Sequence, residues 1–268
     1  MTPDLIPSAA LDFTLQVERL YAALIQFAGG VTAGQQAAEE PSLGGKLLYT
    51  GELEPHGRAM LVAGNIAGAA SLAATAGPEA QKQAIRDGVA DFLVTSLDEA
   101  LRILKNEIRK QETVAVCIGA APEAVEREML ERGVLPDLLA QLLSLASLSF
   151  GPGVRRIEPK AAPGSQVLVT WTVSATSAQW LPKLDAIATD CLSQADAAGR
   201  RWLRLAPRYL GRMAQGLRAL HCEPDAARTF VRRVRNAVEC GEIEVEVQIG
   251  WNRDEEVFLF QPSSGQVS

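Results

Sequence analysis

Between Lys46 and Leu142 the chain alternates between short apolar runs and longer stretches with helical periodicity, and this alternation limits the folds open to it. The apolar runs predict five strands, at residues 47–50, 71–74, 90–94, 113–118 and 138–142. Each intervening stretch is long enough for a helical crossover, the connection that parallel strands require. The pattern therefore predicts an α/β fold with a Rossmann-like, five-stranded parallel sheet.

Helix-start residues fit the same interpretation. Ser96 stands at an N-cap position and Glu99 completes a capping box, while Pro78 and Pro122 suit the first turn of a helix. Gly88 follows a helical stretch at a position where helices commonly end. The expected helices span residues 11–28, 57–69, 78–87, 97–110 and 122–131.

Residues 151–166 interrupt the alternation with prolines, glycines and mixed charge, so we expect a domain boundary there. Beyond it we predict strands at residues 167–173, 242–249 and 257–260, and helices at residues 181–197, 207–220 and 224–239. This half is expected to be a smaller α+β domain. The predicted domains are residues 1–150, which include an N-terminal helix, and residues 151–268.

Charge and cysteine content narrow the class of protein. Lysine and arginine number 26 against 32 acidic residues, a net charge of −6, which argues against a dedicated nucleic-acid binder. Four cysteines without a CxxC pair, and an adjacent His221-Cys222, predict no metal site. The cysteines lead us to expect a cytoplasmic protein in a reducing compartment. With neither a basic leader nor a run of about 20 strongly apolar residues, we expect no secretory signal and no membrane partner.

The first half carries five short motifs in a fixed order. They are Gly45-Lys46-Leu47, Ala63-Gly64-Asn65-Ile66-Ala67-Gly68, Gly88, Ser96-Leu97-Asp98-Glu99-Ala100-Leu101 and Arg132-Gly133-Val134-Leu135-Pro136-Asp137. In order and spacing they resemble the nucleotide-binding domain of urocanase over about residues 11–137. The resemblance implies a hydratase of histidine degradation that uses tightly bound NAD as an electrophile.

The chain departs from that family at the cofactor site. The resemblance implies a turn of the type GGMGGAQ after the first strand, but here the matching stretch has one glycine, Gly57, with Glu52 and Glu54 where a diphosphate would sit. The acidic residue expected after the second strand is also missing. We therefore expect a urocanase-related protein that has lost NAD-dependent hydration and acts as a ligand-binding or assembly module, with no cofactor. An NAD-dependent, urocanate-hydratase-like lyase is the alternative, and whether the chain is an enzyme stays open.

If a ligand still binds, three residues are the candidates for contacting it. Gly57 opens the helix after the first strand, and Gly119 and Ala120 precede the helix that starts at Pro122, an arrangement typical of anion binding. His56 is either a general acid or base or an exposed turn residue. No catalytic residue is assigned.

Residues 200–235 contain ten arginines and only two acidic residues. Spacings of three or four place Arg201, Arg204, Arg208 and Arg212 on one helical face, provided that the helix continues through Pro207. This arginine face has two possible roles. It pairs with an acidic surface, which includes the strand of Glu242, Glu244 and Glu246, or it makes the protein an arginine-mediated binder of nucleic acid or of an acidic partner.

Self-association is the remaining expectation. Residues 59–70 are rich in alanine and glycine, and residues 138–148 are almost wholly apolar, which leaves much apolar surface to bury. We therefore predict a homo-oligomer, with a dimer favoured.

Overall fold

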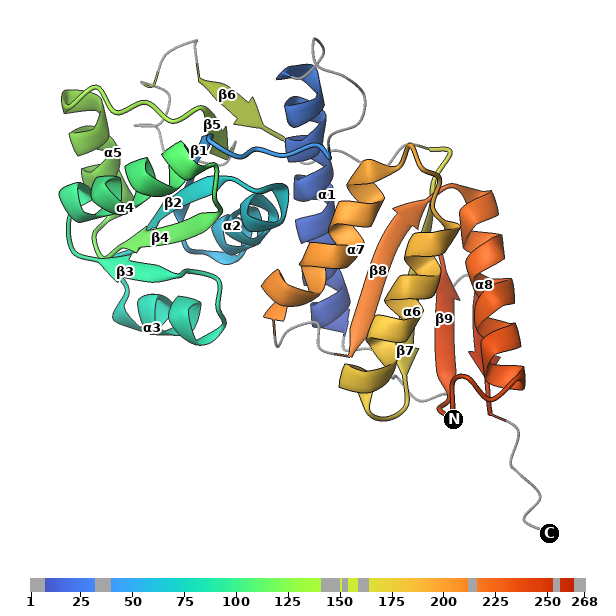
Figure 1. Cartoon of the computed structure of the whole chain (residues 1–268). Helices are drawn as coiled ribbons and strands as arrows, with labels where there is room; N and C mark the ends of the chain where they lie inside the picture. Colours follow the sequence, from blue (N-terminus) through green and yellow to red (C-terminus); the bar gives the residue numbers. More distant parts are fainter. Residues whose placement is uncertain are drawn as a thin grey trace. The chain divides into compact units, whose positions relative to one another are not determined.

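The computed structural model describes residues 8–31, 40–140, 150, 154–158, 164–211, 216–252 and 256–262 (Figure 1). The chain divides into two compact units. The Rossmann-like unit comprises residues 16–160, and the C-terminal unit comprises residues 161–268 together with residues 1–15. Helix α1, Ser8–Val31, contributes to both units, so the division falls inside a helix as well as near the boundary predicted at residues 150 and 151.

The Rossmann-like unit is built on a parallel sheet in the order β3-β4-β2-β1-β5-β6. This confirms the predicted fold class, with one strand more than the five expected. The extra strand, β6, lies in the predicted linker, where a three-residue edge strand with two exposed arginines leaves no apolar run to recognise. The strands are β1 Leu47–Glu52, β2 Ala70–Ala74, β3 Phe92–Val94, β4 Val114–Ile118, β5 Leu138–Ala140 and β6 Arg155–Ile157.

Side chains of the sheet alternate between two covered faces. Tyr49 and Leu72 pack in one buried cluster with residues of α4 and α5, whereas Leu48 and Ser71 face Gly64 of α2. Burial on both faces explains the continuous apolar runs in the sequence. The helices are α2 Pro55–Ala67, α3 Pro78–Arg86, α4 Leu97–Lys110 and α5 Pro122–Glu131.

Local signals set several of these boundaries. The Ser96 hydroxyl accepts a hydrogen bond from the Glu99 amide at 3.3 Å, as the capping box predicts. The Glu99 carboxylate accepts from the amide of Thr95, at 3.0 Å. Gly88 and Gly133 take φ values of +68° and +65° after α3 and α5, a conformation that glycine adopts without strain.

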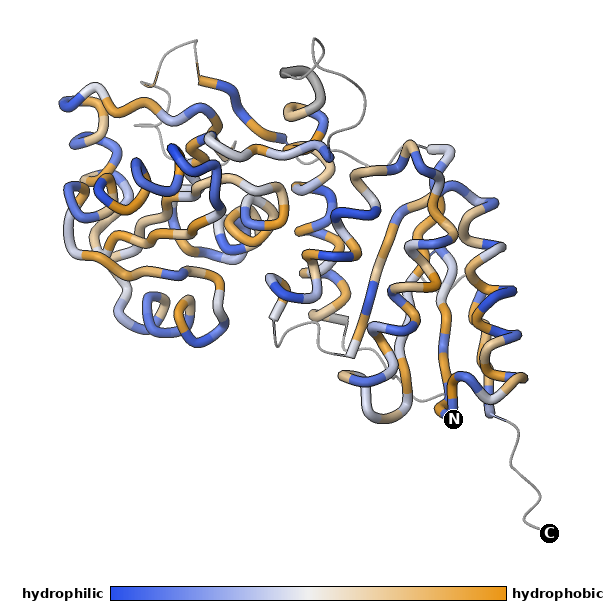
Figure 2. Tube along the Cα trace, in the orientation of Figure 1, coloured by the Kyte–Doolittle hydropathy of each residue, from blue (hydrophilic) through white to orange (hydrophobic). Residues whose placement is uncertain are grey.

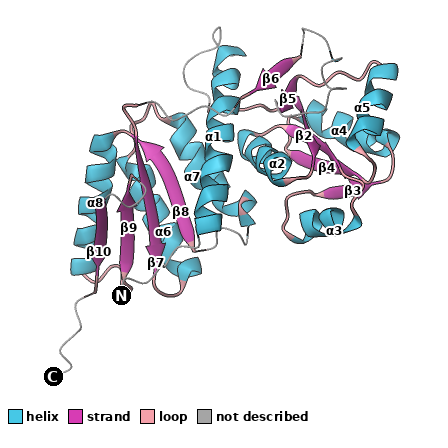
Figure 3. Cartoon of the chain, turned by 180° about the vertical axis from the view of Figure 1, so that it is seen from behind, coloured by secondary structure: helices cyan, strands magenta, loops and turns pink. Residues whose placement is uncertain are grey.

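The C-terminal unit is an antiparallel sheet in the order β10-β9-β7-β8, which confirms an α+β fold (Figure 3). Helices α6 and α8 cover one face, and Figure 2 shows hydrophobic residues following the strands of both sheets. The elements are β7 Val167–Val173, α6 Ser177–Cys191, α7 Ala197–Tyr209, β8 Leu217–Cys222, α8 Pro224–Glu239, β9 Val247–Trp251 and β10 Glu256–Phe260.

Three predictions in this unit are wrong. The helix expected at residues 181–197 instead spans Ser177–Cys191. The helix expected at residues 207–220 does not form, because α7 runs through Pro207 only to Tyr209 and residues 217–222 pair with β7 as a strand. The strand expected at residues 242–249 begins only at Val247. The amides of Glu242 and Ile243 instead donate to the carbonyl of Ala237 at the end of α8, at 2.9 and 3.1 Å, which holds this segment against the helix.

The close approach of α2 to the sheet can be tested at Gly64. A Cβ at this position would lie 2.6 Å from Leu48 Cδ2 and 2.8 Å from Ser71 Oγ, so Gly64→Ala forces buried neighbours to move. We expect the free energy of unfolding to fall by about 1–3 kcal/mol, the usual cost of overpacking. Urea denaturation measures the change.

Gly77→Ala is the matched control in the same unit. Gly77 has a φ of −77°, and its Cβ would meet no atom closer than 3.7 Å. The control should lose at most about 1 kcal/mol, the cost of alanine at an N-cap. Equal losses in the two variants would contradict the packing account.

Candidate functional site

The order of the parallel strands places the candidate site at the carboxyl end of β1. The chain moves from β1 to β2 on one side, and β5 pairs with β1 on the other side. Open α/β sheets bind ligands outside the carboxyl ends of their strands, where the chain changes direction in this way. The loops that follow β1, β2 and β4 therefore form the candidate site.

Gly57 lies at the start of α2 in close contact with the end of β1. A Cβ built on Gly57 would lie 1.9 Å from the Glu52 carbonyl oxygen, closer than any real contact. The register of β1 shifts between Tyr49 and Gly51, and Gly51 has a φ of +74°, so the strand is irregular just before this contact. The missing side chain of Gly57 is thus required by backbone packing inside the protein.

Two carboxylates stand beside the same helix terminus. Glu54 is the exposed N-cap residue of α2, and its side chain makes no capping hydrogen bond. The half-buried Glu52 accepts a hydrogen bond from the amide of Leu53 at 3.2 Å. Carboxylates at a helix N-terminus are stabilised by the helix dipole, and they repel a second anion.

A glutamine connects the loops after β2 and β4. Gln81 of α3 donates to the carbonyl of Thr75 at 2.9 Å, and its Nε2 would lie 3.3 Å from a Cβ on Gly119. Gln81 therefore occupies the space beside Gly119. The sequence did not single it out, because its neighbours lie in other loops and no local motif marks it.

The amides of Gly119 and Ala120 already have partners. They donate to the carbonyls of Val94 and Ile118, both at 2.9 Å. The N-cap residue of α5, Ala121, has no polar side chain, and Glu123 occupies the first turn. An anion site at this helix would have to rely on other donors, and the predicted ligand contacts of Gly57, Gly119 and Ala120 remain predictions.

His56 lies in the first turn of α2 and is half-buried, which differs from the exposed turn residue considered as one interpretation. Its Nδ1 lies 3.4 Å from Nε2 of Gln16 on α1. Its Nε2 is buried and has no hydrogen-bond partner among the described residues. Burial lowers the pKa of His56 below its ordinary value, so the neutral imidazole is favoured.

A buried polar pair lies near the same strand. The hydroxyl of Tyr49 on β1 donates to Glu126 Oε1 on α5 at 3.3 Å, and both side chains are fully buried. Burial, together with Glu126, raises the pKa of Tyr49 far above its ordinary value. Helical periodicity marks the acid of this pair in the sequence, since Glu126 falls on the buried stripe of α5 with Val125 and Met129.

Cys117 of β4 is a core residue, as predicted. Its side chain is almost completely buried, and burial raises the pKa of the thiol to about 12. The thiolate form needed for nucleophilic attack is therefore strongly disfavoured at neutral pH.

The predicted arginine face is divided in the structure. Arg201 is buried on α7, whereas Arg204 and Arg208 are exposed, and Arg212 lies outside the described residues. The guanidinium of Arg208 lies 5.2 Å from the ring centre of Tyr209. Three further arginines form ion pairs with aspartates of their own unit, namely Arg218 with Asp185, Arg228 with Asp225 and Arg233 with Asp190.

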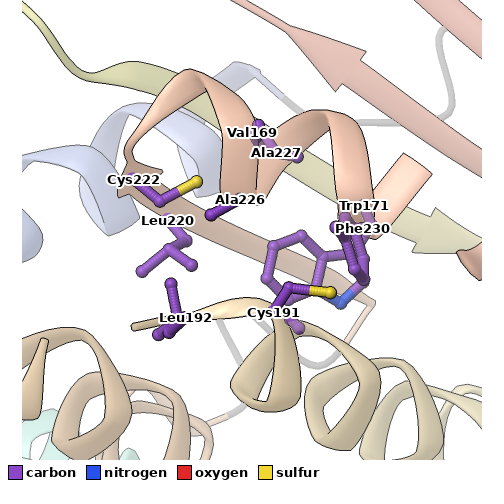
Figure 4. Close-up of a pocket in the computed structure, with 10 residues that line it drawn as sticks. Val169, Trp171, Cys191, Leu192, Leu220, Cys222, Ala226, Ala227 and Phe230 are labelled. Atoms are coloured by element: carbon purple, nitrogen blue, oxygen red, sulfur yellow. The ribbon is translucent and has the colours of Figure 1, made fainter. Parts of the chain in front are cut away.

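The C-terminal unit contains an apolar cavity under α6 and α8 (Figure 4). Its volume is about 10 Å³, and its lining includes Trp171, Cys191, Cys222 and Phe230. Space of this size holds at most one water molecule, and an apolar lining gives that water few partners. We therefore interpret the cavity as a packing defect and not as a ligand site.

The described part of the chain has neither a metal-binding cluster nor a membrane-spanning helix. No group of histidine, cysteine, aspartate and glutamate side chains in it is arranged to hold a metal ion. None of its helices is long and apolar enough to cross a membrane.

Comparison with protein-family models identifies the Rossmann-like unit. Residues 28–151 match the family model described as the Urocanase Rossmann-like domain. The match includes β1 to β5 and α2 to α5, and it confirms the resemblance seen in the sequence. The whole C-terminal unit lies outside it.

The buried position of His56 predicts a pH dependence of stability. A folded-state pKa below the unfolded value of about 6.5 means that the unfolded chain binds the proton first as the pH falls. The free energy of unfolding should therefore be greatest above about pH 6.5 and decline between that pH and the lower folded-state pKa. His56→Gln should flatten this decline in urea denaturation curves recorded from pH 7.5 to 5.0.

His221→Gln removes the only other histidine of the chain and serves as the control. This variant should keep the contribution that comes from His56. A decline that persists unchanged in His56→Gln would contradict the assignment.

Proposed function

We propose that this chain is a urocanase-related protein whose Rossmann-like unit no longer supports NAD-dependent hydration, and that it acts as a ligand-binding or assembly module. The observation that carries the proposal is the contact between Gly57 and the carbonyl oxygen of Glu52, where a Cβ would lie at 1.9 Å. This glycine is committed to holding α2 against β1. Close helix-to-strand packing is only one of the roles that glycines have in a dinucleotide-binding turn, and residues 52–56 contain no further glycine that would let the backbone approach a pyrophosphate.

The charge at the β1–α2 loop supports the same proposal. A dinucleotide places its pyrophosphate at the N-terminus of the first helix, where backbone amides and the helix dipole attract it. In this chain the carboxylates of Glu52 and Glu54 stand there. Phosphates brought among these carboxylates would be repelled.

The loops after β2 and β4 also do not fit NAD. The loop after β2 reads Thr75-Ala76-Gly77, without the carboxylate that grips ribose hydroxyls in dinucleotide-binding folds. The Gln81 side chain stands beside Gly119, and the amides of Gly119 and Ala120 are bonded to backbone carbonyls. The residues present in these loops do not fit NAD.

The state of the four cysteines indicates the redox conditions of the compartment in which the protein is found. All four are present as thiols outside any disulfide, with Cys117 and Cys222 buried and Cys240 exposed. Free thiols persist in reducing compartments. We propose a cytoplasmic location on this ground.

Native mass spectrometry of freshly purified protein tests the proposed function. We expect no mass excess corresponding to a dinucleotide when native and denatured masses are compared. Incubation with urocanate, with and without added NAD, should leave the near-ultraviolet absorbance of urocanate unchanged. A urocanase that retains the glycine-rich turn, purified in the same way, is the positive control.

The opposite result supports the alternative function. A mass excess that matches NAD, together with consumption of urocanate, would contradict the proposal and indicate a urocanase-like hydro-lyase. Gly57, His56 and Gly119 would then be the first positions to mutate.

A further inference from the structure

Strand β10 is an exposed edge with an apolar sequence. It is the terminal strand of its sheet, and among the described residues only β9 pairs with it (Figure 3). Residues 257–260 read Val-Phe-Leu-Phe, and the side chains of Val257 and Leu259 are 49% and 52% exposed. Phe258 and Phe260 are half-buried on the opposite face, with parallel rings 6.5 Å apart.

Edge strands of this kind usually carry protection against pairing. Lysine, proline, bulges or inward-pointing charges prevent a second strand from adding to the edge. Residues 257–260 contain no proline and no charged residue. Strand β10 pairs with β9 in regular register over five residues, without a bulge. The edge is therefore suited to receive another strand.

We propose that a second copy of this chain occupies the edge, with the two β10 strands pairing antiparallel and joining two four-stranded sheets into one. Antiparallel pairing of identical strands is isologous, as a twofold dimer requires. Centred on Phe258, it places Val257 opposite the partner's Leu259 and so covers the two most exposed apolar side chains of the strand.

Charge complementarity favours the same register. Glu256, Phe258 and Phe260 share one face of the sheet, because they pair with Trp251, Ile249 and Val247 of β9. The guanidinium of Arg235 on α8 lies 5.6 Å from the ring centre of Phe260 on that face. In the centred register Glu256 lies opposite the partner's Phe260, which brings its carboxylate next to the partner's Arg235.

Among the other terminal strands of the two sheets, β3 of the Rossmann-like unit is the competitor that exposes large apolar side chains. Phe92 and Leu93 are 47% and 42% exposed, but β3 has only three residues. A longer, self-complementary edge offers more backbone hydrogen bonds and more paired side chains, so we assign the contact to β10. This inference deepens the assembly role and does not depend on loss of NAD, because bound nucleotide and subunit number are separate quantities.

Sedimentation velocity over a concentration series tests the contact. The wild-type chain should sediment as a dimer, and Leu259→Lys, which places a lysine opposite the partner's Val257, should raise the dimer dissociation constant about tenfold or more. Leu135→Lys changes an equally exposed leucine of the Rossmann-like unit and should leave the dissociation constant unchanged. Circular dichroism confirms that each variant is folded.

A charge exchange tests the register. Glu256→Arg and Arg235→Glu should each weaken the dimer, and the double variant should recover most of the wild-type affinity because the two charges again oppose each other across the interface. An effect on folding alone would not produce this recovery.

Three outcomes would overturn the proposal. One is a wild-type chain that stays monomeric at every concentration. Another is that the Phe92→Lys variant dissociates into monomers while the Leu259→Lys variant remains dimeric, which would assign the contact to β3. The third is a dimer whose affinity does not respond to the charge exchange, which would exclude the centred register.

Discussion

The start of α2 lies against the end of β1 at a distance that only glycine allows, and much of the Rossmann-like unit depends on this contact. Gly57 brings the helix to the Glu52 carbonyl, and Gly64 brings the same helix against Leu48 and Ser71 two turns later. Every residue of α2 from Ala59 to Ala67 is buried as a result. A helix seated this closely places its N-terminus at the carboxyl end of β1, where ligands of such sheets bind.

The same contact is one of the grounds for our proposal that this dinucleotide-type fold binds no dinucleotide. Features that attract phosphate in such folds are glycines, free amides and an uncompensated helix dipole. Here the glycine contacts backbone, the amides of Gly119 and Ala120 are bonded to carbonyls, and Glu54 stands at the helix terminus. The family match thus establishes the architecture of residues 28–151, while the chemistry has to be argued from the residues at the site.

Elements with strong local signals were predicted to the residue. Helix α4 begins after Ser96, α5 begins at Pro122 and α8 begins at Pro224. The predicted bounds of all three helices agree with the structure. The strands β6 and β8 were missed, because β6 is short and polar and residues 217–222 fit a helix as well as a strand until pairing with β7 decides. Propensity is a weak prior where tertiary pairing competes with it.

The candidate site was less predictable than the fold. The sequence placed Gly57 at the start of α2, but its spacing from the Glu52 carbonyl is a three-dimensional quantity. Gln81 lies beside Gly119, which is distant from it in sequence, and the hydrogen bond from the Gly119 amide to Val94 depends on how β3 and β4 are placed. The role of Glu126 could have been predicted from the sequence, because a carboxylate on a buried helical stripe needs a hydrogen-bond partner, which here is Tyr49.

Replacement of Gly57 by alanine measures the central contact most directly. If Gly57 serves backbone packing, the added methyl group must push α2 away from β1, and the free energy of unfolding should fall by about 3 kcal/mol, the upper end of overpacking costs. The loss should be the same with and without added NAD. An unchanged stability would contradict the account, because it would mean that α2 stands away from the strand and leaves room for a ligand.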